Sequence, residues 1–125
     1  RREVAAYWNQ EFKAYEQYLM LPREQPGTRH VYFGYPVCVK PGAPVSRRQL
    51  QEHLEKHGVE TRPIQSGDMT LQPAMNGINY RVSGTLDNTR FLHNNAFWWG
   101  THQGIGQVER EAIAGYVAEF FDSVL

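Results

Sequence analysis

The spacing of apolar residues predicts a helix near each end of the chain. Over residues 2–20, apolar side chains recur every three or four positions, which is the period of one helical face. Residues 107–124 repeat this pattern. The two predicted apolar faces consist of Val4, Trp8, Phe12, Tyr15 and Leu19, and of Ile113, Tyr116, Val117, Phe120, Phe121 and Val124. Pro22, Pro26 and Gly27 end the first helix and predict a linker after it.

A period of two predicts a strand over residues 31–39. Its alternating apolar residues, which point to one face, are Val31, Phe33, Tyr35, Val37 and Val39. Gly34 and Pro36 fall on the opposite face. Because proline has no N–H, we expect this strand to lie at an edge of the sheet or to contain a bulge.

Capping residues predict the next helix. Ser46 followed by Gln49 is typical of a capping box, and Gly58 suits a left-handed residue just beyond the helix, so the helix runs to about His57. Residues 59–63 then read as a short strand that ends at Pro63.

A long polar segment, residues 64–86, follows that strand, with at most one helical turn near 71–75. A loop of this length in a compact domain is usually functional. Asp87 is expected to cap a short helix over 88–94, and 97–99 is expected to be a strand. This order of elements predicts a small sheet covered by helices, which is the α+β class.

Charge and cysteine content narrow the functional classes. The chain has 13 Lys and Arg against 13 Asp and Glu, so it lacks the basic footprint of a nucleic-acid-binding protein. No apolar run has the length of a membrane span. Cys38 is the only cysteine, which excludes an internal disulfide and a cysteine zinc site and fits a cytoplasmic location. The start at Arg1 suggests a fragment of a longer protein.

Few residues point to chemistry by their spacing. His53 and His57 lie four apart on one predicted helix, as metal ligands can, but they flank the apolar Leu50 and Leu54, so we predict no metal site. The glycine-rich residues 100–106 match no phosphate-binding motif. Arg62, at a strand end before a loop, suits either a phosphate or carboxylate ligand or a surface ion pair.

Aromatic residues offer surfaces on which a planar ring could stack, although packing in the core is their usual role. They are Phe33, Tyr35, Phe97, Trp98 and Trp99. Two adjacent tryptophans in a strand cannot both face the core, so at least one of Trp98 and Trp99 should be exposed or at an interface.

Several long stretches in one order resemble the C-terminal small domain of the sugar aminotransferase/dehydratase family, fold-type-I enzymes that use vitamin B6 phosphate. They read YFGYPV at 32–37, GAPVSRRQLQEHLEKHGVETR at 42–62, T-x-QPA at 70–74 and NYRVSGTLDNTRFLHNNAFWWG at 79–100. The resemblance covers nearly the whole chain and is strongest to the nucleotide-sugar 3-dehydratases that use pyridoxamine phosphate. It implies one small domain over 1–125 with a mostly antiparallel sheet packed against helices.

The resemblance also implies roles for individual residues. Family transaminases tend to have histidine where this chain has Phe33, so Phe33 favours dehydration and, with Tyr35, is expected to flank a pyridoxamine or pyridoxal phosphate cofactor. Arg62 corresponds to an arginine bordering the sugar site, and Asp68 lies in the same loop, where dehydratases tend to read Gly-Gly-Asn and this chain reads Ser66-Gly67-Asp68. Residues 101–103 also depart from the family pattern.

The resemblance places the catalytic lysine or histidine and the cofactor anchors in a large domain that this chain does not contain. We therefore expect no catalytic residue and no bound cofactor in this chain, and no activity from it alone. The parent enzyme would act on the C3 hydroxyl of a 4-keto-6-deoxy nucleotide sugar, as a cytoplasmic homodimer. The alternatives are the small domain of a sugar aminotransferase and a free-standing module that binds a sugar or a protein.

Overall fold

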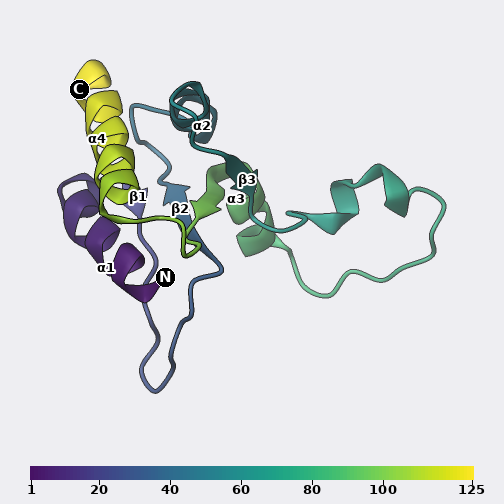
Figure 1. Ribbon diagram of the computed structural model, residues 1–125. Helices are drawn as coiled ribbons and strands as arrows, with labels where there is room; N and C mark the ends of the chain where they lie inside the picture. Colours follow the sequence, from purple (N-terminus) through teal and green to yellow (C-terminus); the bar gives the residue numbers. More distant parts are fainter.

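Four short strands form one sheet at the centre of the protein. A computed structural model describes all residues, 1–125, and gives the strand order β1-β2-β4-β3, with every neighbouring pair antiparallel (Figure 1). The strands are β1 Leu19–Met20, β2 Gly34–Val39, β3 Thr61–Pro63 and β4 Ala96–Gly100. The helices are α1 Arg2–Glu11, α2 Arg47–Lys56, α3 Asp87–Asn95 and α4 Gln107–Val124, with 3-10 turns at Phe12–Tyr15, Met69–Leu71 and Pro73–Met75. The predicted α+β class with an antiparallel sheet is confirmed.

The inner face of the sheet packs against α1, α2 and α4. Tyr35 of β2 and Trp99 of β4 are fully buried there against Trp8 and Phe12. The ring centroids of these four residues lie 5.1–6.1 Å apart, mostly in edge-to-face orientation. Aromatic pairs of this kind contribute about 0.5–1.5 kcal/mol each beyond the burial of their surface, so this cluster holds the helices on the sheet.

The first helix is shorter than predicted. It ends at Glu11, continues as a 3-10 turn to Tyr15, and gives way to β1 instead of reaching residue 20. Leu19 keeps its buried position by pairing with Val39 of β2, and the N–H of Lys40 donates to the carbonyl of Tyr18. Tertiary pairing with β2 therefore overrides a helical spacing that Leu19 satisfies only by coincidence.

The predicted strand over 31–39 begins three residues late, at Gly34. Tyr32 has φ +50°, a left-handed conformation that a strand cannot contain, and this places Val31 and Phe33 outside β2. β2 lies inside the sheet, yet β1 pairs only with Cys38 and Val39. Pro36 therefore has a neighbouring strand on one side only, which is the environment that its missing N–H requires.

Most of the capping predictions are confirmed. Ser46 caps α2 in a capping box with Gln49, and Gly58 has φ +78° just after the helix. Asp87 does not cap α3. It lies in the first turn, where its carboxylate accepts a hydrogen bond from Thr85, and Leu86 precedes the helix with φ +58°. The expected strand at 97–99 and closing helix at 107–124 are both present.

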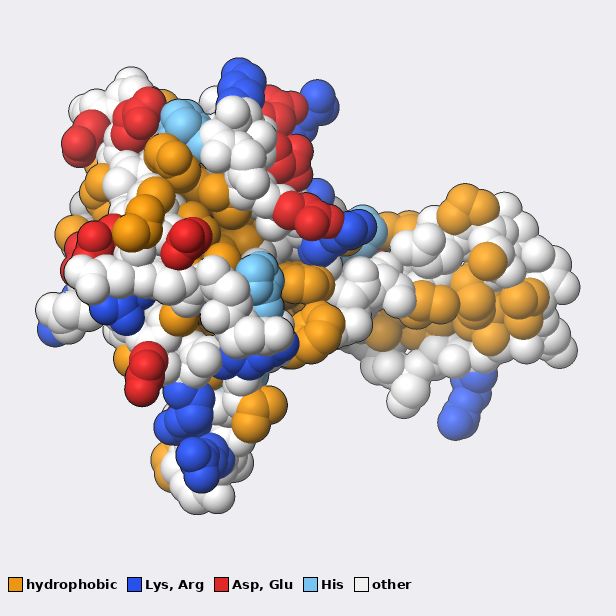
Figure 2. Space-filling model, viewed as in Figure 1, with side chains coloured by type: hydrophobic (Ala, Val, Ile, Leu, Met, Phe, Trp, Pro, Cys, Tyr) orange, Lys and Arg blue, Asp and Glu red, His pale blue; other side chains and the backbone are white.

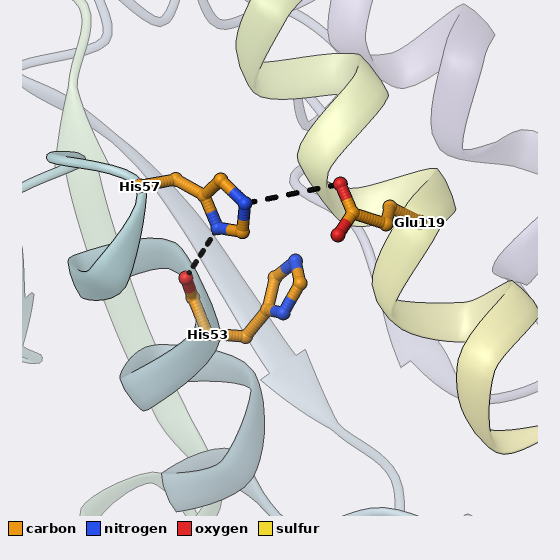
Figure 3. Close-up of side chains that lie close together, drawn as sticks. All are labelled: His53, His57 and Glu119. Carbon is orange, nitrogen blue, oxygen red and sulfur yellow. Dashed lines mark hydrogen bonds and ion pairs between the residues drawn. The ribbon is translucent and has the colours of Figure 1, made fainter.

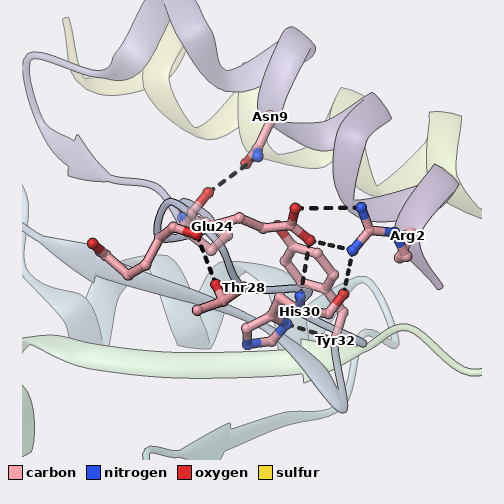
Figure 4. Close-up of polar contacts among 8 residues, drawn as sticks. Arg2, Asn9, Glu24, Thr28, His30 and Tyr32 are labelled. Atoms are coloured by element: carbon pink, nitrogen blue, oxygen red, sulfur yellow. Dashed lines mark hydrogen bonds and ion pairs between the residues drawn. The ribbon is translucent and has the colours of Figure 1, made fainter.

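The linker between β1 and β2 is fastened to α1 by polar contacts (Figure 4). The guanidinium of Arg2 pairs with the carboxylate of Glu24, which also accepts the N–H of His30 at 2.9 Å. Asn9 donates to the carbonyl of Pro22 at 3.1 Å. The hydrogen bond from Arg2 holds the pKa of Glu24 below its usual range. These contacts position the residues that lead into β2.

Residues 64–86 form an arm that projects away from the sheet (Figure 1, right). Figure 2 shows apolar side chains along this arm, and its exposed large hydrophobic residues are Met69, Leu71, Ile78, Tyr80 and Val82. Its backbone hydrogen bonds are local, such as Leu71 N–H to Asp68 and Ile78 N–H to Met75. No helix of the protein is both long enough and apolar enough to cross a lipid bilayer.

The outer face of the sheet carries a close contact between Trp98 and Gly34. An added Cβ at Gly34 would lie 2.2 Å from Cε3 of Trp98, so only glycine lets this indole lie against the backbone of β2. Gly34→Ala should therefore displace the indole and lower the free energy of unfolding by about 1–3 kcal/mol, the usual cost of overpacking. Urea unfolding and the tryptophan emission spectrum measure both effects.

Gly115→Ala is the matched control for this substitution. An added Cβ at Gly115, in α4, meets nothing within 4 Å, so the same change should be neutral or stabilise the helix by about 0.5–1 kcal/mol. Equal effects of the two substitutions on stability would contradict the contact between Trp98 and Gly34.

Candidate functional site

A pair of aromatic rings, one exposed (Phe33) and one half-buried (Trp98), forms the centre of the candidate site. Phe33 is 68% exposed, and its ring centroid lies 5.2 Å from that of Trp98 in edge-to-face orientation. The indole N–H of Trp98 donates to the carbonyl of Pro63 at 3.0 Å, which fixes the plane of the ring. Trp99 points to the core and Trp98 to the opposite face, where it is half-buried, so the two tryptophans do not share a face. Trp98 and Phe33 form a rigid aromatic wall on the outer face.

The backbone before Phe33 is strained and held in place by polar side chains. Tyr32 adopts φ +50°, which costs a bulky residue about 1–3 kcal/mol and persists only where the surroundings enforce it. The hydroxyl of the buried Thr101 donates to the carbonyl of Tyr32 at 2.6 Å. The guanidinium of Arg1 donates to the carbonyls of Tyr32 and Phe33 at 3.1 and 2.8 Å. These contacts fix the direction in which Phe33 leaves the strand.

Arg62 lies on the same outer face, because it pairs with Trp98 in the register of β3 and β4. Its guanidinium is exposed and forms an ion pair with Glu60. Of the two roles predicted for Arg62, the surface ion pair is therefore present. One nitrogen makes this contact, and since a guanidinium has five N–H donors, others remain for an anionic ligand beside Trp98.

A cavity of about 670 Å³ extends from Arg62 and Trp98 toward α4. It passes the loop after β4 and ends between α4 and the end of α2, where His102, Glu109, Tyr116 and His57 line it. Trp99 also lines it, and its indole N–H is buried without a hydrogen-bond partner. The cavity thus joins the exposed wall to a buried hydrogen-bond donor.

Tyr35 occupies a position that does not fit the predicted cofactor contact. Its side chain lies on the inner face of the sheet, has no exposed surface, and donates its hydroxyl to Asn9 at 2.7 Å. Burial raises the pKa of this phenol far above its usual value. The sequence had placed Phe33 and Tyr35 on one face, but the left-handed turn at Tyr32 leaves Phe33 outside β2, so Phe33 does not follow the alternation of the strand.

Asp68 is buried and bonded within its own loop. One carboxylate oxygen accepts the N–H and the hydroxyl of Thr70 at 2.9 and 2.6 Å, and the other lies 3.4 Å from Nε of Arg90. The Thr70 hydroxyl, together with its N–H and Arg90, holds the pKa of Asp68 below its usual value. Asp68 therefore shapes the start of the arm, and no oxygen of it faces the outer wall as a ready ligand.

The structure thus brings Phe33 and Arg62 to one face around Trp98, while Tyr35 and Asp68 stabilise the fold beneath and beside that face.

The sequence analysis did not identify Thr101 and Glu60. No spacing rule indicates Thr101, whose partner lies 69 residues away. Glu60 lies two residues before Arg62, so the two-residue period of an extended chain places both on one side and could have predicted this ion pair.

Two named proteins are similar in sequence to most of this chain. It is 28% identical to the lipopolysaccharide biosynthesis protein RfbH of Salmonella typhimurium over 121 residues, which are 97% of this chain and 28% of that protein. It is 32% identical over 104 residues to the GDP-4-keto-6-deoxy-D-mannose 3-dehydratase of Escherichia coli O55:H7, covering 82% of this chain and 26% of the enzyme. The chain therefore spans less than a third of the length of these relatives.

A solved structure supports the same relationship. The E. coli GDP-4-keto-6-deoxy-D-mannose-3-dehydratase with bound hydrated PLP superimposes with a TM-score of 0.76 at 27% identity, over 92% of this chain and 29% of that one. The sequence model of the DegT/DnrJ/EryC1/StrS aminotransferase family matches residues 1–118. The resemblance inferred from the sequence motifs is confirmed, and the chain belongs to the DegT/DnrJ/EryC1/StrS aminotransferase family.

Proposed function

We propose that this chain is the C-terminal small domain of a B6-dependent nucleotide-sugar 3-dehydratase and that its outer sheet face forms one wall of the active site. The observation that carries the proposal is the exposed ring of Phe33, which packs edge-to-face on the half-buried Trp98 beside Arg62. An exposed ring held by a fixed aromatic neighbour suits contact with a ligand or a partner surface. The dehydratases among the relatives support the reaction class.

The residues of the wall fit a planar cofactor and an anionic substrate. The rings of Phe33 and Trp98 present an apolar surface to a pyridine ring, and the guanidinium of Arg62 matches a phosphate or a carboxylate. Pyridoxamine or pyridoxal phosphate, when bound, supplies the electron sink for the removal of the C3 hydroxyl. This chain would orient the sugar and exclude water on one side. The residues that move protons would belong to the large domain.

Phe33 is the feature that favours dehydration over amino transfer. A phenylalanine at this position provides no group that accepts or donates a proton, whereas a histidine would. The exposed apolar side chains of the arm, such as Leu71 and Ile78, support a second part of the proposal: they would pack on the large domain or on the second subunit of a cytoplasmic homodimer.

Arg62 provides the most direct kinetic test. In the whole enzyme, Arg62→Ala should raise KM for the nucleotide sugar roughly 10- to 100-fold, because a hydrogen bond to a charged group contributes about 1.5–3 kcal/mol. Steady-state kinetics measure this effect. Glu60→Gln is the matched control, since it removes the competing ion-pair partner and should leave KM unchanged or lower it. Unchanged KM in Arg62→Ala would remove this residue from the site.

Substitutions of Phe33 and Tyr35 should have separate effects on function and stability, because Phe33 is exposed beside the outer face of the sheet and Tyr35 is buried on the inner face. Tyr35→Phe removes the hydrogen bond to Asn9 and should lower the free energy of unfolding by about 0.5–1.5 kcal/mol, with the cofactor absorbance of the whole enzyme unchanged. Phe33→Ala should do the reverse, lowering kcat/KM with little loss of stability, because the ring is exposed. If Tyr35→Phe alone impaired cofactor binding, the assignment of the two faces would be wrong.

A further inference from the structure

Two histidines and one glutamate converge where the end of α2 meets α4 (Figure 3). His53 lies in α2, His57 is the residue that ends it, and Glu119 lies in α4. One possible ligand atom from each side chain lies within 4.8 Å of the others. His57 Nε2 is 3.8 Å from Glu119 Oε2, and solvent reaches both groups.

Packing between α2 and α4 holds both imidazole rings in place. Leu50 and Leu54 are buried in the core, as their spacing predicts, and the two histidines turn toward α4 beside them. The His57 ring stacks on Tyr116 with centroids 4.3 Å apart, and the His53 ring lies 5.3 Å from Phe120. The rings are therefore oriented before any ligand arrives, which lowers the entropy lost on binding.

Hydrogen bonds to backbone carbonyls determine which nitrogen of each ring donates. His57 Nδ1 lies 2.9 Å from the carbonyl of His53 and donates to it, which leaves Nε2 as the ring nitrogen that faces Glu119 and can bind a metal when it carries no proton. Metal-bound histidines are typically supported in this way. His53 Nε2 lies 2.9 Å from the carbonyl of Tyr116 and donates to it. To bind a metal through this atom, the ring must move its proton to Nδ1 and give up that hydrogen bond.

Spacing alone predicted no metal site at the two histidines, but Glu119 of α4 supplies a third ligand, and we propose that His53, His57 and Glu119 form a zinc site that links the end of α2 to α4. Two imidazoles and one carboxylate, with water in a fourth position, are a ligand set that zinc uses, whereas Mg²⁺ and Ca²⁺ prefer oxygen ligands. Ligands about 2.0–2.1 Å from a tetrahedral zinc lie about 3.4 Å apart. The three ligand atoms now lie within 4.8 Å of one another and must come closer, which the exposed Glu119 side chain and a turn of the His53 ring allow.

The site has a structural consequence for the cavity described above. His57 and Tyr116 line the part of the cavity between α2 and α4, at the opposite end from Arg62. Zinc at this position adds a direct link between two helices that otherwise meet through side-chain packing and the polar contacts of His53 and His57. Because zinc binds the folded chain, where the three side chains meet, it raises the unfolding temperature progressively as its free concentration exceeds the dissociation constant.

Isothermal titration calorimetry of the 125-residue chain, without a histidine tag, tests the site with ZnCl2 and with MgCl2. The expected result is one zinc per chain, no heat from magnesium, and an unfolding temperature that rises with zinc. His57→Gln and Glu119→Gln should each weaken zinc binding at least tenfold, since loss of a mere supporting partner already costs about 10- to 100-fold. Glu111→Gln is the matched control, because Glu111 lies on α4 and contacts Gln107 instead.

Three outcomes would overturn the proposal: no zinc binding at 100-fold excess over protein, zinc affinity in Glu119→Gln equal to that of the wild type, or equal heats from zinc and magnesium. The zinc-free unfolding temperature shows whether each variant folds. Glu119 is exposed and its substitution leaves the packing of α2 on α4 intact, so Glu119→Gln decides the matter if His57→Gln does not fold.

Discussion

Antiparallel pairing of β2 with β4 determines both the core and the candidate site. In this register Tyr35 lies opposite Trp99 and Gly34 lies opposite Gly100, with Pro36 opposite Trp98. The side chains of a strand alternate between faces, so the same pairing sends Tyr35 and Trp99 inward and Trp98 outward. A shift by one residue would exchange the two sets, burying the wall and exposing the core.

The inner cluster makes this register stable, and the stable register makes the outer wall rigid. Trp8 and Phe12 of the first helical segment pack on Tyr35 and Trp99, which ties α1 to the centre of the sheet. Trp98 can then lie against the backbone of Gly34, which has no side chain, and the strained turn at Tyr32 determines the orientation of Phe33. Strain of this kind is common at functional sites, where a fixed direction is worth its energetic cost.

The elements with strong local signals were predictable from the sequence. Ser46, Gln49 and Gly58 define α2 by capping chemistry, and the apolar period of 107–124 defines α4. Leu19 and Tyr32 were not predictable in this way. Leu19 leaves the helical pattern because β2 pairs with its backbone, and the left-handed turn at Tyr32 depends on Thr101, far along the chain. Resemblance to the family assigned site roles to Phe33, Arg62 and Asp68. The structure shows that Phe33 and Arg62 are exposed and that Asp68 is buried.

The central claim is that the outer sheet face contacts ligand in the whole enzyme, and hydroxyl-radical footprinting of Phe33 and Trp98 tests it most directly. With cofactor bound, addition of the nucleotide sugar should reduce the oxidation of both side chains, while Met20 of β1, which is exposed and belongs to neither the wall nor the arm, serves as the reference. Protection of Phe33 and Trp98 is the result that this account predicts. Oxidation of both residues at the same rate with and without cofactor and sugar would contradict it.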